Sequence, residues 1–121
     1  MALVMGLRET PKKMKVNTML TSLVYLTARE GREEAFHALA VRLTGITRSE
    51  DDGCLVYTFH RRVDNPREYV LYEQWRDVQA LGAHIEHLQA LFGPPRPGES
   101  LPAAILDLCE LGEGVAYEVV A

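Results

Sequence analysis

Two histidines three residues apart, His84 and His87, are the residues of this sequence best suited to chemistry. A neutral imidazole exchanges protons near pH 7, so either side chain could act as a base. At roughly 100° per residue, His84 falls at the edge of the apolar face of its predicted helix, whereas His87 points mainly to solvent. Three interpretations stay open for the pair. They are a base or hydrogen-bond donor beside a pocket, a pair of metal ligands with no evident third partner, or boundary histidines satisfied by backbone or water.

Aromatic side chains lie close to these histidines in the sequence. Trp75 ends a predicted strand just before the helix, where its indole would offer a planar ligand a flat wall and one N–H donor, or would pack in the core. Tyr57 and Tyr72 could donate phenolic hydrogens to a substrate oxygen, or could simply pack. Cys54 has no neighbouring base in the sequence and fits better as a small buried hydrophobe. The sequence contains no phosphate-binding loop, dinucleotide-binding, zinc-protease or serine-hydrolase motif.

Length and composition predict one small domain. The chain has 121 residues, of which 47% are apolar and 25% charged, and its net charge is −4. No apolar run is long enough to span a bilayer, and the mild acidity argues against binding to nucleic acid or to an anionic membrane. Two cysteines are too few for a disulfide framework. We therefore expect a cytoplasmic protein with no nucleic-acid or membrane partner.

The spacing of apolar residues predicts the elements that hold these side chains. Strands are expected over residues 20–28, 54–61, 67–75 and 115–120, with Gly112 and Gly114 breaking the chain before the last one. Helices are expected between Gly31 and the acidic turn at residues 50–53, over residues 78–92 with Asp77 as its N-cap, and over residues 101–108. This order predicts an α+β, ferredoxin-like split βαβ fold with an antiparallel four-stranded sheet. Residues 1–18 are expected to be a mobile N-terminal extension and residues 19–121 the folded domain.

Both faces of the predicted sheet carry large apolar side chains. In the second strand, Leu55 and Tyr57 share one face while Cys54 and Val56 share the other. A sheet with one face in water should instead alternate apolar and polar residues. Burial of each extra large apolar side chain is worth about 1.5–3 kcal/mol, so the second face should be covered. We therefore predict a homodimer in which two sheets pack against each other.

Three segments together resemble the antibiotic biosynthesis monooxygenase (ABM) domain family. They are DGCLVY at residues 52–57, YVLYEQWRD at residues 69–77 and ALGAH at residues 80–84, and the resemblance runs from about Met19 to Val120. It implies a dimeric α+β barrel with a pocket in each subunit between the sheet and the helices. Characterised relatives oxidise quinols or polycyclic phenols with O₂ and carry no flavin, haem or metal.

The resemblance also implies roles for single residues. His84 would accept and donate protons, and Trp75 would form a wall of the pocket and orient the substrate ring. Tyr57 or Tyr72 would hold an oxygen atom of the substrate. Relatives that act on aromatic polyketides tend to carry an asparagine four residues before the tryptophan. Leu71 stands there in this chain, which argues against polyketide substrates, and it is expected to contact the substrate.

The function expected from these roles is a cofactor-independent monooxygenase for a small quinol-like or phenolic substrate. Two alternatives remain, because this fold hosts many functions. One is a non-catalytic dimeric protein of the same fold that binds a ligand or responds to stress. The other is a haem-binding or haem-degrading relative with His84 as the axial ligand.

Overall fold

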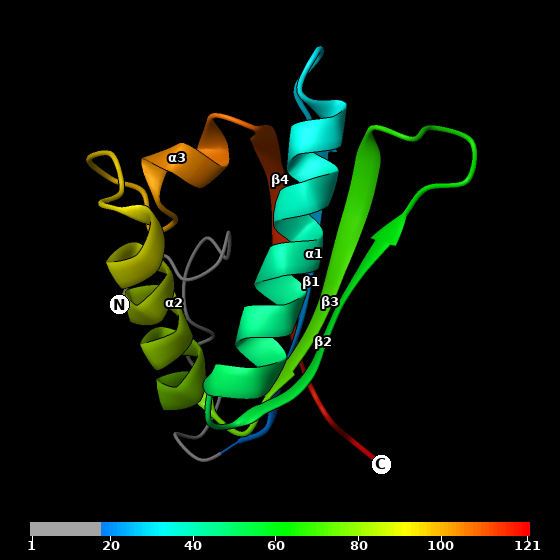
Figure 1. Cartoon of the computed structure of the whole chain (residues 1–121). Helices are drawn as coiled ribbons and strands as arrows, with labels where there is room; N and C mark the ends of the chain where they lie inside the picture. Colours follow the sequence, from blue (N-terminus) through cyan, green and yellow to red (C-terminus); the bar gives the residue numbers. More distant parts are fainter. Residues whose placement is uncertain (1–17) are drawn as a thin grey trace.

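A computed structural model describes residues 18–121 of the chain. The predicted mobile extension at residues 1–18 lies outside these residues, apart from its last position. The elements follow in the order β1 (Leu20–Ala28), α1 (Glu33–Glu50), β2 (Cys54–Arg61), β3 (Glu68–Trp75), α2 (Val78–Phe92), α3 (Ala103–Leu106) and β4 (Cys109–Glu118). The four strands form one antiparallel sheet in the order β2-β3-β1-β4. The predicted α+β, ferredoxin-like class is therefore confirmed (Figure 1).

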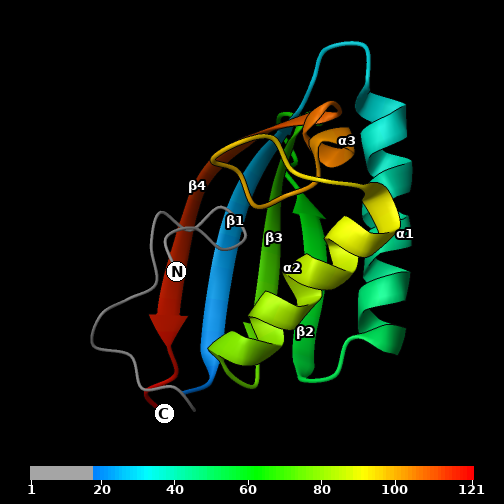
Figure 2. The ribbon, with the colours of Figure 1, turned by 90° about the vertical axis from the view of Figure 1, so that its left-hand side faces the viewer.

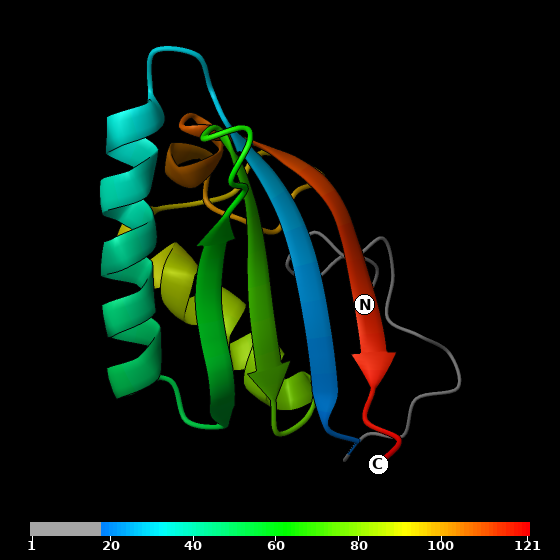
Figure 3. The same ribbon diagram turned by 90° about the vertical axis from the view of Figure 1, so that its right-hand side faces the viewer.

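The three helices cover one face of the sheet. Figure 2 shows α2 crossing this face diagonally, with α1 along one side and α3 near one end. Figure 3, from the opposite side, shows the strands in front and no helix over them. Within residues 18–121, no helix combines the length and the hydropathy needed to cross a membrane.

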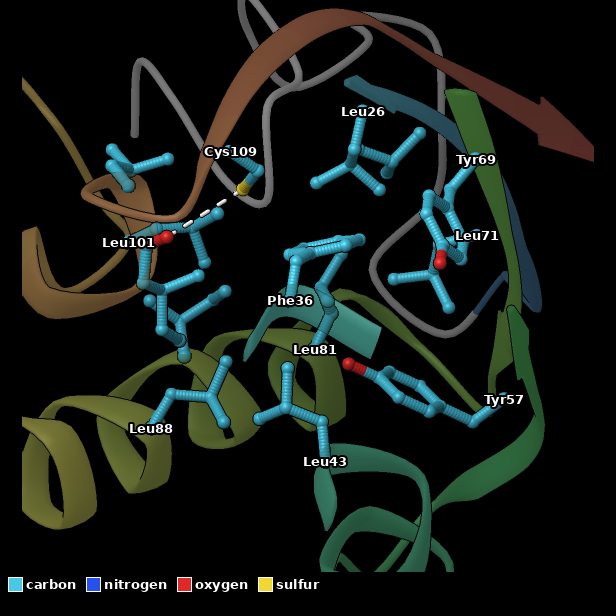
Figure 4. Packing of buried hydrophobic residues seen from close by; sticks show 14 of the residues in the cluster. Leu26, Phe36, Leu43, Tyr57, Tyr69, Leu71, Leu81, Leu88, Leu101 and Cys109 are labelled. Carbon is cyan, nitrogen blue, oxygen red and sulfur yellow. Dashed lines mark hydrogen bonds between the residues drawn. The ribbon is translucent and has the colours of Figure 1, made fainter. Parts of the chain in front are cut away.

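The core fills the layer between the sheet and the helices. Every second residue of β1 and β3 is buried, as the period of two in a strand requires. Figure 4 shows Phe36 and Leu43 of α1 packed in one cluster with Leu81 and Leu88 of α2. Tyr57 reaches from β2 into the same layer. Side chains for the site must therefore come from this layer or from its rim.

The second helix begins and ends where the sequence predicts. The carboxylate of Asp77 accepts a hydrogen bond of 2.8 Å from the backbone N–H of Ala80, which is a standard N-cap. This cap fixes the first turn of α2 directly after Trp75, the last residue of β3. The cap thereby sets the position of His84, two turns further along the helix.

The last strand differs from the prediction. The strand β4 runs through Gly112 and Gly114 rather than starting after them, and α3 is shorter than the expected 101–108. The pairing of β1 with β4 shifts register between Val24 and Leu26. A Cβ atom on Gly112 would lie 3.1 Å from the carbonyl oxygen of Tyr25. Glycine here permits the close backbone approach at the irregularity, so it continues the strand instead of breaking it.

The start of β2 also differs from the prediction. Strict alternation places Leu55 with Tyr57 and puts Cys54 on the opposite face. In the structure, the β2–β3 register shifts between Cys54 and Val56, and Cys54 pairs with Trp75. Cys54 consequently packs against the core, while Leu55 is 49% exposed. In a β-bulge, two residues of one strand lie opposite a single residue of its partner. The side chains that precede the bulge therefore point to the opposite face of the sheet from the one that strict alternation predicts.

Candidate functional site

A tight turn brings the end of α1 against the start of α2. Gly53 has φ of +85°, and a Cβ atom there would lie 2.7 Å from the Cβ of Ala80. The backbone N–H of Arg76 donates a 2.8 Å hydrogen bond to the carbonyl of Gly53, which fixes the turn to the end of β3. Asp51 caps the end of α1 and donates its backbone N–H to the carbonyl of Thr47 at 3.1 Å. The turn therefore presents the Asp51 side chain to α2.

The Asp51 carboxylate binds both histidines of α2. Its Oδ2 accepts a hydrogen bond from Nδ1 of His84, and its Oδ1 accepts one of 2.5 Å from Nδ1 of His87. The exposed fraction of the side chain rises outward, from 0% at His84 through 7% at Asp51 to 26% at His87. Nε2 of His87 lies 3.5 Å from a carboxylate oxygen of Glu50. The three side chains thus form a continuous hydrogen-bonded path from the core to the surface.

The charge of Asp51 settles which histidine atoms donate. Burial acts to raise the pKa of Asp51, but the hydrogen bonds from His84 and His87 outweigh burial, so the pKa lies below its usual value. An ionised carboxylate can only accept, so both Nδ1 atoms carry hydrogen. In a neutral His84 ring, Nε2 then presents a lone pair. Among residues 18–121, this buried Nε2 has no hydrogen-bond partner, so His84 has the arrangement of an oriented base.

Two aromatic rings surround His84. Its ring centroid lies 4.7 Å from that of Trp75, with an angle of 37° between the planes. The Tyr57 ring lies 5.4 Å from His84 and meets it edge-on. All three side chains are at most 1% exposed. Burial raises the pKa of Tyr57 well above its usual value, so the phenol keeps its proton. The site therefore joins a base to an aromatic wall and a phenolic hydroxyl group.

A buried carboxyl group, Glu73, lies beside the tryptophan. The indole N–H of Trp75 donates a 3.0 Å hydrogen bond to Oε1 of Glu73. Burial raises the pKa of Glu73 to about 8. The hydrogen bond from Trp75 acts to lower this pKa, but its effect is smaller than that of burial. Its second oxygen, Oε2, is buried and has no partner within the described part of the chain. The residue pattern of the sequence predicts no role for Glu73, although a lone carboxylate on the apolar face of a strand is a signal that could have found it.

The residues proposed from the sequence do not all lie together. His84, Trp75 and Tyr57 share one cluster between the sheet and α2. Leu71 is on the same sheet face but lies two rows away from Trp75, opposite Phe59. Tyr72 pairs with Leu23 and Thr58 on the uncovered face, so it cannot touch a ligand beside His84. His87 is bound to Asp51 rather than pointing mainly to solvent.

A surface pocket of about 500 Å³ lies against the outer side of this cluster. Asp51, Arg76, His84 and His87 are among its lining residues, whereas Trp75 and Tyr57 are not. Within residues 18–121, no group of three or more His, Cys, Asp or Glu side chains is arranged so that it could hold a metal ion. Both Nδ1 atoms of the histidine pair are instead taken up by Asp51. The pocket thus borders the proton-handling side chains and stops short of the aromatic wall.

Solved structures with the same fold come from several bacteria. One is a conserved protein of unknown function from Bacteroides thetaiotaomicron, described as a possible oxidoreductase, with a TM-score of 0.68 and 20% identity over 85% of this chain and 99% of that one. Another is a candidate antibiotic biosynthesis monooxygenase from Deinococcus radiodurans, with a TM-score of 0.65 and 23% identity over 84% and 93%. A third, from Caulobacter crescentus and described in the same way, has a TM-score of 0.61 and 20% identity over 88% and 92%. At these identities the likeness establishes the fold.

The sequence itself establishes the family. No curated protein matches the chain. The family model described as antibiotic biosynthesis monooxygenase, however, matches residues 19–90, which include β1, α1, β2, β3 and most of α2. That segment contains Asp51, Tyr57, Glu73, Trp75 and His84, the side chains of the cluster described above. The resemblance expected from the three sequence segments is thereby confirmed, and the chain belongs to the antibiotic biosynthesis monooxygenase family.

Proposed function

We propose that this protein is a cytoplasmic, cofactor-independent monooxygenase that oxidises a small phenolic or quinol-like substrate with O₂. The observation that carries the proposal is the buried Nε2 of His84, which has no partner among residues 18–121 while Asp51 holds the other ring nitrogen. Such an arrangement suits a base that removes a proton inside an apolar site. Membership of the family supports the same class of reaction.

The proposed chemistry begins with deprotonation of the substrate. Nε2 of His84 accepts the phenolic proton, and the positive charge that develops on the imidazole is stabilised by the Asp51 carboxylate through Nδ1–H. The phenolate is electron-rich and transfers two electrons to dioxygen. One oxygen atom enters the product and the other leaves as water, with two further electrons supplied by the substrate. A dihydroxy substrate can supply all four electrons because it ends as a hydroxyquinone.

The aromatic side chains orient the ring in this scheme. The Trp75 indole provides a flat surface, and Tyr57 retains a proton that it can donate to a substrate oxygen. These rings pack on one another and are fully buried. A ring-sized substrate must therefore displace part of this packing, and it enters from the pocket bordered by Asp51 and His87.

Isotope labelling tests the proposed activity directly. The protein is incubated with a panel of quinols and phenols under ¹⁸O₂, and the products are examined by mass spectrometry. A monooxygenase incorporates one ¹⁸O atom into each product molecule, at a rate that increases with protein concentration. Binding of the compounds without oxygen uptake above the protein-free rate would instead assign the chain to the ligand-binding alternative.

The partner expected in solution is a second copy of the chain. The uncovered sheet face carries Leu23, Tyr25, Val70, Tyr72 and Tyr117, and two of its tyrosines, Tyr25 and Tyr117, are each 49% exposed. Burying such a face against its own copy would remove large apolar groups from water. This supports the predicted homodimer.

Light scattering after size-exclusion chromatography measures the oligomeric state. Replacing Tyr25 on the uncovered face by Arg should shift a dimer to a monomer, because it places a charge on the face that the proposed dimer buries. Replacing Val41, which is 63% exposed on α1, by Arg is the matched control and should leave the dimer intact. A wild-type protein that elutes as a stable monomer would overturn this part of the proposal.

A further inference from the structure

Four buried side-chain polar atoms lack a hydrogen-bond partner within residues 18–121; one is Thr47 Oγ1 on α1, and the other three belong to neighbouring residues. Ser22 Oγ, Glu73 Oε2 and His84 Nε2 are all buried and have no hydrogen-bond partner within residues 18–121. Ser22 and Glu73 face each other across β1 and β3, and His84 packs on the same tryptophan that binds Glu73. Buried polar atoms are nearly always paired in native proteins, so a group of unpaired ones indicates a place where a ligand supplies the partners.

The two ends of this group have opposite hydrogen-bonding character. His84 Nε2 is an acceptor because Asp51 occupies Nδ1–H. The Glu73 carboxyl is held through Oε1 by the Trp75 indole, while Oε2 has no partner in the described part of the chain. With a pKa of about 8, the carboxyl is mostly protonated at pH 7 and can donate a hydrogen bond. Trp75 touches both groups, so one ligand lying on its indole could reach both.

We propose that Glu73 is a substrate-binding residue of this site, in which its protonated carboxyl donates a hydrogen bond from Oε2 to one oxygen of the ligand while His84 Nε2 accepts one from another. The inference rests on the proposed function for the identity of the ligand as a dihydroxy-aromatic compound. It adds that the second oxygen is required, and that the site works only while Glu73 is protonated. An ionised Glu73 would repel electron-rich oxygen atoms instead of binding them.

Two titratable groups on β2 face Glu73, and neither can reproduce this loss of binding between pH 7 and pH 9. From β2, Tyr57 and Cys54 both have pKa values raised by burial above their usual, already alkaline, values. The buried side chains of α1 and the β1 neighbour Ser22 carry no titratable group. From α2, His84 is the one titratable side chain among the buried residues. Any effect of His84 on the pH dependence of ligand binding is the same in the wild type and in the variants of Glu73.

The test uses the single tryptophan as the reporter of binding. The chain contains one tryptophan, Trp75, and it bonds directly to Glu73. Under anaerobic conditions, quenching of its fluorescence by catechol, resorcinol, hydroquinone and phenol is measured between pH 6 and pH 9.5. The same titrations are made with Glu73→Gln, which keeps a donor but cannot ionise, and with Glu73→Leu, which has no donor.

The proposal predicts a specific pattern of affinities. The wild type should bind its preferred dihydroxybenzene about tenfold more weakly at pH 9 than at pH 7, because a group with a pKa near 8 is about one-tenth protonated at pH 9. Glu73→Gln should retain its affinity at pH 9. Glu73→Leu should bind the dihydroxybenzene no better than phenol. Equal pH dependence in the wild type and Glu73→Gln, or no quenching of the wild type by any dihydroxybenzene, would overturn the inference.

The two proposals can fail separately. If the wild type binds in this pH-dependent way but consumes no oxygen, the Glu73 inference stands and the monooxygenase proposal fails. If labelled oxygen enters the product at the same rate at pH 9 in the wild type and Glu73→Gln, the monooxygenase proposal stands and Glu73 has no part in binding.

Discussion

Asp51, the residue directly after α1, accepts a hydrogen bond from Nδ1 of His84, which lies 33 positions further along the chain on α2. The two elements meet because Gly53 allows the turn between them to approach Ala80 closely. The base of the proposed reaction is thus assembled from a turn and a helix, and the turn orients it. This arrangement predicts how variants of the turn should behave.

Replacing Asp51 by Asn should greatly reduce oxygen uptake. The amide removes the negative charge that stabilises the imidazolium, and its NH₂ group can face Nδ1 and favour the wrong tautomer. We expect a loss of roughly 10²–10⁴-fold in kcat with a smaller change in KM. Asp52→Asn is the matched control, because its side chain is 93% exposed and pairs with Arg76 rather than with a histidine. Oxygen-electrode kinetics of the two variants make the comparison, and equal rates would show that Asp51 has no role in the chemistry.

Replacing Gly53 by Ala should destabilise the protein more than the same change at Gly31. Both glycines have φ near +80°, which costs other residues about 1–2 kcal/mol. At Gly31 the new Cβ meets no atom within 4 Å, whereas at Gly53 it would overlap Ala80. Overpacking should add about 1–3 kcal/mol. Urea unfolding measures both variants, and a Gly53→Ala variant no less stable than Gly31→Ala would show that the turn can move away from α2.

The buried Glu73 should make stability depend on pH. The folded protein keeps the proton of this carboxyl up to about pH 8, while the unfolded chain releases it near pH 4.5. The folded state therefore binds more protons between these values, and the free energy of unfolding falls as the pH rises through them. Glu73→Gln lacks this effect. The melting temperature of the variant, relative to that of the wild type, should therefore rise from pH 5 to pH 8.

An exposed carboxylate provides the control for this prediction. Glu113→Gln on β4 alters a side chain at the surface, so its melting temperature should follow that of the wild type at every pH. Scanning calorimetry in buffers of matched ionic strength measures all three proteins. Parallel curves for the wild type and Glu73→Gln would mean that the carboxyl is not held protonated in the fold.

Much of the fold could be predicted from periodicity alone. The bounds of β1 and α2 and the order of all elements follow from apolar spacing and one N-cap, because these are local properties of the chain. The bulge at Cys54 and the passage of β4 through Gly112 could not, since both depend on pairing with a neighbouring strand. The strand propensity of a residue is a property of that residue alone. It does not determine which residue of a neighbouring strand will pair with it.

The site was predictable only in part for the same reason. His84, Trp75 and Tyr57 could be selected by residue type and family pattern, and they lie together. Asp51 was visible only as part of an acidic turn that ends a helix, because its contact with α2 is made by tertiary packing. Tyr72 and Glu73 are consecutive residues of β3, so their side chains lie on opposite faces of the sheet. Only the Glu73 side chain therefore lies on the face that carries the site.

Oxygen uptake by a His84→Ala variant tests the central claim most directly. The wild type, His84→Ala and the control His37→Ala, a histidine on α1 whose ring faces Tyr69 rather than Asp51, are assayed with the same quinol. We expect His37→Ala to match the wild type. His84→Ala should lose roughly 10²-fold or more of the rate and regain part of it when imidazole is added to replace the missing base. Oxygen uptake by His84→Ala at the wild-type rate would contradict the account.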